Sequence, residues 1–184
     1  MEIPYEPSHT EGMIARSFSK IWGVEVVEGD LLDLEAIRAA LRGTRAAYFC
    51  YPIRPGIAQA TAIFEQAAKE SGIEGIVNMS QISSRSDSPS HAAQDHWLSE
   101  QVFDWSGVAT AHLRPTFFAD WLLWIAPMIR GGLIQGPWGT GKHAPITTHD
   151  MARVIVAILK KSRAAPRQDL PALWAGRIYL PGSR

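Results

Sequence analysis

The sequence predicts an α/β fold, a parallel sheet with flanking helices, from the stretch between Ala46 and Ser80. Residues 46–51 form a short apolar run, which is typical of a strand buried on both faces. An amphipathic helix follows, because apolar residues recur every three or four positions. The stripe consists of Ile57, Ala60, Thr61, Phe64, Ala67 and Ala68, among which Thr61 is polar. Gly72 ends the helix and residues 76–79 form a second apolar strand, so two parallel strands are joined by a helical crossover.

Two segments precede this unit. Residues 1–22 are expected to form a loose arm and a short helix, and residues 23–184 the folded domain. Within that domain, residues 24–27 are expected to form a strand. Asp33 is the expected N-cap of a helix, because its side chain can accept hydrogen bonds from the first free backbone N–H groups. The apolar residues of that helix are Leu34, Ile37, Ala40 and Leu41.

The elements after Ser80 continue the alternation of helix and strand. They are a serine-rich loop at 83–90, a helix at 91–105, a strand at 108–113, an aromatic-rich helix at 117–129, short strands and turns at 133–148, a helix at 151–159 and a strand at 177–180. The aromatic-rich helix is so apolar that we expect it to be buried or to cover a pocket. Its residues Phe117, Phe118, Trp121 and Trp124 then belong either to the core or to a wall over a substrate.

The composition excludes several classes of protein. Eighteen basic and eighteen acidic residues leave no net charge and no basic cluster, so nucleic acid is not an expected partner. The single cysteine, Cys50, lies in an expected buried strand and is predicted to pack as a small apolar side chain. No apolar stretch reaches the roughly twenty residues of a membrane-spanning helix. With no secretory signal visible, we expect a cytoplasmic protein.

Polar residues follow the second strand of the central unit. Asn78 and Ser80 lie at its end, and the loop from Gln81 to Ser90 continues from them. Open α/β sheets bind ligands beyond the carboxyl ends of their strands. This position therefore indicates a binding site, although Ser and Asn are also common residues in turns that bind nothing.

Known catalytic motifs are largely absent. None of the four tyrosines has a lysine four residues later, and there is no Gly-x-Ser-x-Gly, His-Glu-x-x-His or phosphate-binding Gly-Lys-Ser/Thr motif. The six histidines do not show metal-ligand spacing. His96 and Glu100 are four apart and share one side of the 91–105 helix, where they either orient a proton donor or form a surface or capping pair.

Five segments in order resemble the NmrA-like group of atypical short-chain dehydrogenase/reductases. They are 23–33, Tyr51-Pro52, 76–80, 96–100 and 113–118. The resemblance implies the third to sixth strands of a Rossmann-type sheet that binds NADP or NAD. It makes Asp30, Tyr51, Pro52, Asn78 and Pro115 the implied cofactor contacts and places Ser80 and His96 near the reacting centre as catalytic residues.

The sequence departs from that family at its beginning. Members open with a strand, a glycine-rich loop that binds the pyrophosphate, a helix and a second strand, and the sequence shows none of these. We therefore expect either a truncated sheet, which we favour, or one that closes differently, by joining its strands directly or by borrowing a second chain.

Three functions follow from the resemblance. The first is an NAD(P)-dependent oxidoreductase for a small carbonyl or quinone compound, favoured by the apolar wall from Phe117 to Trp124. The second is a regulator that senses NAD(P) without turnover, favoured by the absent tyrosine–lysine pair. The third is a truncated product that binds no cofactor. The expected partners are a small-molecule substrate and, as oligomer, a homodimer.

Overall fold

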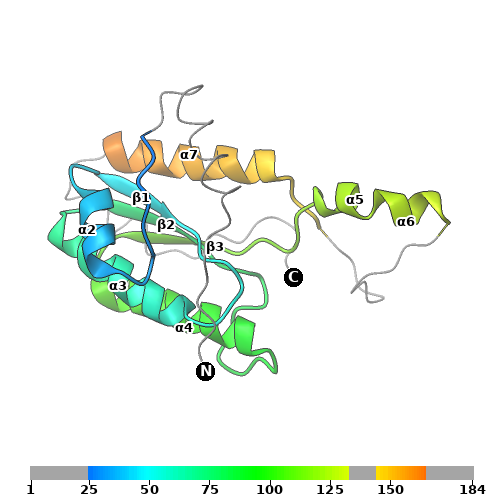
Figure 1. The fold of residues 1–184 in the computed structure, drawn as a ribbon, viewed down its shortest axis with the longest axis horizontal. Coiled ribbons are helices and arrows are strands. Elements are labelled where there is room, and N and C mark those ends of the chain that lie inside the picture. Colours follow the sequence, from blue (N-terminus) through cyan, green and yellow to red (C-terminus); the bar gives the residue numbers. More distant parts are fainter. Residues whose placement is uncertain (1–24, 133–143, 165–184) are drawn as a thin grey trace.

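The computed structural model describes residues 25–132 and 144–164, and Figure 1 shows a parallel sheet between two layers of helices. The strands β1 (Ala46–Phe49), β2 (Gly75–Met79) and β3 (Thr110–Leu113) lie in the order β1-β2-β3. Helices α3 (Ile57–Glu70) and α4 (His91–Ser106) pack on one face, and α7 (Thr148–Ala164) packs on the other. The predicted α/β class is confirmed. The expectations for residues 1–24, 133–143 and 177–180 lie outside the described residues.

The central β-α-β unit has the predicted elements. β1 pairs in parallel with β2, and β2 pairs in parallel with β3, so that Asn78 lies opposite His112. Alternate residues of β2 point to opposite faces. Ile76 therefore joins the core beneath α3 and α4, whereas Val77 joins the core beneath α7. In the first core, Phe49 packs against the ring of Phe64 with centroids 4.8 Å apart.

Helix α2 (Leu34–Leu41) packs against α3 and begins with the predicted cap. The Asp33 carboxylate accepts hydrogen bonds from the N–H groups of Glu35 (2.9 Å) and Ala36 (3.4 Å). Ile37 and Leu41 are buried on its inner side.

Removal of this cap is expected to destabilise the fold measurably. Asp33→Ala should lower the free energy of unfolding by about 1 kcal/mol, because two backbone N–H groups lose their acceptor. Urea denaturation at neutral pH measures the difference. Asp33→Asn should lose much less, since the amide oxygen can still accept; equal losses in the two variants would contradict the capping explanation.

The expectation that residues 46–51 are buried on both faces is wrong. Tyr48 is 40% exposed and Cys50 is exposed. The reason is that β1 is the edge of the described sheet and pairs only with β2. Residues 25–27 were expected to be a strand, but they are irregular, and Val27 is 52% exposed. No described strand pairs with them, so their β-branched side chains have no sheet to join.

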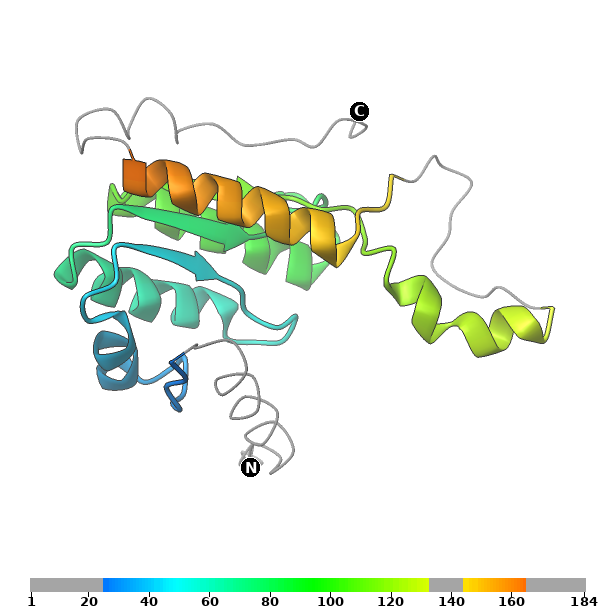
Figure 2. The ribbon, with the colours of Figure 1, turned by 90° about the horizontal axis from the view of Figure 1, so that it is seen from above.

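The aromatic-rich segment also differs from the expectation. It forms two short helices, α5 (Trp121–Trp124) and α6 (Ala126–Arg130), and Pro127 is the second residue of α6, where its missing N–H costs little. Trp121 and Trp124 are 54% and 85% exposed, so predicted burial is wrong for them, whereas Phe118 is partly buried against the core beneath α7. Figure 2 shows why: α5 and α6 extend away from the sheet. Asp120, just before α5, connects this segment to the start of α7, because its carboxylate accepts hydrogen bonds from the Thr148 hydroxyl and N–H.

Helix α7 confirms the predicted helix at 151–159 and extends it at both ends. Thr147 and Asp150 cap it reciprocally, because the Asp150 N–H donates to the Thr147 hydroxyl (3.0 Å), which donates to the Asp150 carboxylate (2.9 Å). Within the described part of the chain, none of the helices has the length and apolar character needed to span a bilayer.

Candidate functional site

The carboxyl ends of β1, β2 and β3 meet at one edge of the sheet, where a pocket of about 200 Å³ opens. One wall comes from the loop between β1 and α3, and the other from the first turns of α4. The lining residues are Pro52, Ile53, Arg54, Pro55, Ile57, His91, Ala92, Asp95 and His96. Most of these side chains are apolar, with the charged groups confined to Arg54 and Asp95.

His96 is the buried polar side chain of this pocket. It is 5% exposed, and its Nδ1 has no hydrogen-bond partner among the described residues. Burial lowers the pKa of His96 below its ordinary value, although the carboxylates of Glu100 and Asp95 oppose this effect. The imidazole is therefore neutral at physiological pH. In a neutral imidazole one nitrogen donates and the other accepts, so His96 can bind a polar atom of a ligand in the pocket.

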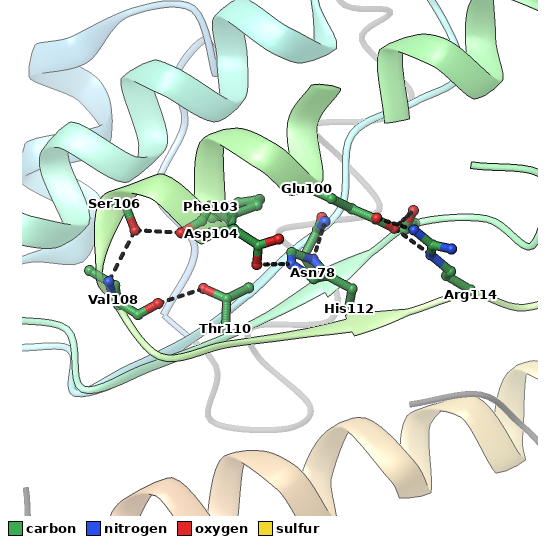
Figure 3. A network of polar contacts seen from close by, with 10 residues as sticks. Asn78, Glu100, Phe103, Asp104, Ser106, Val108, Thr110, His112 and Arg114 are labelled. Atoms are coloured by element: carbon green, nitrogen blue, oxygen red, sulfur yellow. Dashed lines mark hydrogen bonds and ion pairs between the residues drawn. The ribbon is translucent and has the colours of Figure 1, made fainter. Parts of the chain in front are cut away.

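A buried polar network lies behind the pocket, between α4 and the sheet (Figure 3). The Ser80 hydroxyl donates to Glu100 Oε1 (2.6 Å), and Arg114 Nε donates to the same oxygen (2.7 Å). Arg114 also donates to Glu100 Oε2 through a second nitrogen, which makes the pair bidentate. Burial alone would raise the pKa of Glu100, but the hydrogen bonds from Arg114 and Ser80 outweigh it and hold the pKa below its usual range.

A second chain of contacts lies beside this ion pair (Figure 3). The Asn78 amide nitrogen lies 3.1 Å from His112 Nδ1, and His112 Nε2 lies 3.0 Å from Asp104 Oδ1. The Asp104 carboxylate accepts a hydrogen bond from His112 Nε2–H, so His112 Nδ1 accepts one from the Asn78 amide. Asn78 Oδ1 is buried without a partner among the described residues.

The sequence-predicted residues fall into three groups in space. Pro52 and His96 line the pocket, and the Tyr51 ring lies beside it under the Arg54 guanidinium, 5.3 Å from ring centre to Cζ. Ser80 and Asn78 are buried in the network. Two further residues lie outside both groups. Pro115 is buried and its carbonyl accepts from the Ile82 N–H (3.0 Å), whereas exposed Asp30 caps its own turn by accepting from the Leu32 N–H (2.9 Å).

The structure rules out one interpretation of the His96–Glu100 pair, and the orientation of a proton donor stays a prediction. Both residues are buried, so a surface pair is wrong. Arg114, His112 and Asp104 were not singled out from the sequence. The available signal was the alternation of polar residues Thr110, His112 and Arg114 at the end of the predicted strand. The four-residue spacing along α4 from His96 through Glu100 to Asp104 matches it, because His112 contacts Asp104 and Arg114 contacts Glu100.

The described residues hold no group of three or more metal-ligating side chains. Three layers, with a parallel sheet between two layers of helices, and a pocket at the carboxyl ends of the strands are typical of a Rossmann-type nucleotide-binding domain. Residues 14–162 match a family model described as NAD(P)H-binding, and the chain belongs to this family. The predicted kinship with Rossmann-type NAD(P)-binding reductases is confirmed.

Similar proteins include several reductases. The chain is 34% identical over 142 residues to an NAD(P)H azoreductase of Xenophilus azovorans, which covers 76% of this chain and 49% of the relative. It is 32% identical to a (4-alkanoyl-5-oxo-2,5-dihydrofuran-3-yl)methyl phosphate reductase of Streptomyces griseus, covering 74% and 49%. The chain thus spans about half the length of the curated relatives it matches.

Solved structures show the same fold. An NADPH-dependent quinone oxidoreductase of Escherichia coli, in complex with NADPH, superposes with a TM-score of 0.70 at 24% identity. The superposition covers 79% of this chain and 52% of that one.

Proposed function

We propose that this chain forms part of an NAD(P)H-dependent reductase that acts on a small carbonyl or quinone compound. The observation that carries this proposal is the pocket at the carboxyl edge of the sheet, with His96 buried in its wall. The family supplies the cofactor class, and the azoreductase and quinone oxidoreductase among the similar proteins support reduction of an unsaturated small molecule. We also propose a cytoplasmic location and a homodimer.

The residues present fit one side of a bound dinucleotide. Tyr51 and Pro52 follow β1, Asn78 belongs to β2 and Pro115 follows β3, so four proposed contacts lie along the edge where such sheets bind nucleotides. The unpartnered Asn78 Oδ1 is an acceptor that a ligand amide or hydroxyl could satisfy. Asp30 is proposed to contact the adenosine half.

The two residues predicted to be catalytic, Ser80 and His96, are proposed to have different roles. The bound cofactor would supply a hydride. His96 lines the pocket and is proposed to contact the substrate. Ser80 donates to buried Glu100, so we propose that it positions the end of β2 rather than touching the reacting atoms.

Binding and turnover are measured separately. Titration of the protein with NADPH and with NADH, followed by protein fluorescence, tests cofactor binding. Cofactor oxidation in the presence of quinones, aldehydes and an azo dye then tests catalysis. Binding with turnover supports the reductase, and binding without turnover supports the alternative of an NAD(P) sensor. Failure to bind either nucleotide contradicts both.

The loop after β1 offers a sharper test of the cofactor site. Gly56 has φ +104°, and a Cβ there would lie 3.0 Å from the Tyr51 hydroxyl. Gly56→Ala should therefore displace Tyr51 and weaken NADPH binding several-fold, besides a backbone cost of about 1–2 kcal/mol in stability. Gly107 is a matched control, because it has φ +80° and no atom within 4 Å of its Cβ position. Gly107→Ala should lose similar stability and keep its NADPH affinity; equal loss of affinity would contradict the assignment of Tyr51.

A further inference from the structure

The pocket has a size and a lining that restrict what it can bind. Its volume of about 200 Å³ is below the range of about 300–1,000 Å³ typical of sites for drug-sized ligands. Apolar side chains, among them Pro52, Ile57 and Ala92, form most of its walls. A ligand of one or two rings without charge on the ring fits this lining, because burying a charge against apolar walls without a partner is costly.

The tautomer of His96 determines whether the ring donates or accepts a hydrogen bond in the pocket. Nδ1 is buried and has no acceptor within reach among the described residues, so a proton on Nδ1 would be left without a hydrogen bond. The favoured neutral tautomer therefore carries its proton on Nε2. In this tautomer Nε2–H is a hydrogen-bond donor, so it can bind an acceptor oxygen of a ligand.

We propose that this pocket is the acceptor site of the reductase, and that His96 Nε2–H donates a hydrogen bond to a ring carbonyl oxygen of a one- or two-ring aromatic substrate. This inference rests on the proposed function. Bound NAD(P)H would supply two electrons and a hydrogen as hydride and would leave as NAD(P)⁺, so that a negative charge would develop on the substrate oxygen at His96. The hydrogen bond strengthens as that charge grows. Water then supplies the proton, and His96 keeps its own.

Binding at His96 can be tested without cofactor. The probe is a naphthoquinone with methyl groups at both ring positions beside the carbonyls, so that it cannot add to the exposed thiol of Cys50. It is titrated into the ¹⁵N-labelled full chain, and the histidine ring signals are followed by NMR, with His96 assigned from its loss in His96→Gln. Saturable movement of the His96 ring signals is expected; signals that stay still would overturn the proposal.

Three variants then separate a hydrogen bond from packing. Glutamine places an N–H near the position of Nε2, so His96→Gln should bind the probe within a few-fold of the wild type. His96→Leu lacks a donor and should bind about 5- to 100-fold more weakly. It should also unfold at the same or a higher temperature, because it removes an unpartnered buried nitrogen. Equal affinity of the Gln and Leu variants would overturn the role of the N–H.

The pocket is tested independently by filling it. Ala92→Phe should abolish probe binding, whereas Ala39→Phe on the exposed side of α2 should leave it unchanged. Probe binding that survives in Ala92→Phe overturns the assignment of this pocket.

Turnover distinguishes the two proposals. Probe binding at His96 without NADPH oxidation supports the pocket but counts against a reductase. NADPH-dependent quinone reduction that is unchanged in both His96→Leu and Ala92→Phe supports the reductase and overturns the acceptor site. If both proposals hold, these two variants lose kcat/KM for the quinone and keep the NADPH dissociation constant.

Discussion

Replacement of Arg114 by methionine is expected to lower the free energy of unfolding by about 3–5 kcal/mol. Arg114 forms a bidentate pair with Glu100, whose side chain is fully buried. Without the guanidinium, the Glu100 carboxylate has no cation to offset its desolvation. Urea denaturation at neutral pH, followed by circular dichroism, measures the difference between the two proteins.

The pH dependence of this loss follows from the pKa of Glu100. The pair holds this pKa below its usual range, so the stability that it contributes is present above the ordinary pKa of 4.5 and is lost as pH falls through the lower value of the folded state. In Arg114→Met the isolated carboxyl takes up a proton more readily. The difference in stability between wild type and variant should therefore be largest at neutral pH and shrink in acid.

Two controls define the cause. Arg153→Met removes the exposed partner of Asp150, 3.3 Å away, and should change the unfolding free energy by less than about 0.5 kcal/mol. The double variant with Glu100→Leu and Arg114→Met should recover most of the loss, because it leaves no unpaired buried charge. A double variant no more stable than Arg114→Met alone would indicate that packing, not charge, explains the effect.

The elements were predictable where local sequence decides them. The three-or-four spacing from Ile57 to Ala68 suffices for α3, and the short side-chain acceptor at Asp33 suffices for the start of α2. Parallel pairing of β1 and β2 followed from the helix between them. For the two helices, the interactions involved lie within about a dozen residues of one another, so the pattern contains the information. The pairing of β1 with β2 joins residues as far apart as Ala46 and Gly75, but the helix between them restricts how the two strands can meet.

Burial was less predictable, because it depends on segments distant in the sequence. The apolar run at 46–51 is compatible with a central strand, but Tyr48 is exposed because no described strand lies beyond β1. Trp121 and Trp124 are apolar enough for a core, yet α5 extends away from the sheet. An apolar pattern shows that burial of one face of an element is favourable. It does not show which other segment packs against that face.

The candidate site was predicted in part for the same reason. The family resemblance drew attention to Pro52 and His96, and the structure brings both to one pocket. The strand-end rule drew attention to Asn78 and Ser80, which are buried in the polar network. The ion pair of Glu100 with Arg114 depends on the register of β2 and β3 and on the rotation of α4 above them. Neither is encoded by spacing along one element, so the charged centre of the network was missed.

Glu65 carries the second large expected effect, which is a gain in stability. This side chain lies between α3 and α4 at 4% exposure, and neither carboxylate oxygen has a partner among the described residues. Ser106 is near, but its hydroxyl donates to the Phe103 carbonyl (2.7 Å). Burial raises the pKa of Glu65 to about 7, and Lys69 on the same helix opposes this only in part.

The sign of the pH effect follows directly. Between the ordinary pKa of 4.5 and about 7, the folded chain holds the Glu65 proton more tightly than the unfolded chain does. The free energy of unfolding of the wild type therefore falls as pH rises through this range. Glu65→Gln has no charge to bury, so it should be about 1–3 kcal/mol more stable than the wild type at pH 8 and nearly equal to it at pH 4.5.

Glu70 on the same helix provides the matched control. Arg38 holds the pKa of exposed Glu70 at about 2, with a further hydrogen bond from Gln66. Its contribution to stability is present above the ordinary pKa and lost in acid, so Glu70→Gln should be slightly less stable than the wild type at pH 8. Thermal unfolding of both variants across pH 4.5 to 8 makes the comparison. Stabilisation by both substitutions would indicate a general effect of removing negative charge from α3, whereas opposite signs would assign the effect to the buried carboxyl of Glu65.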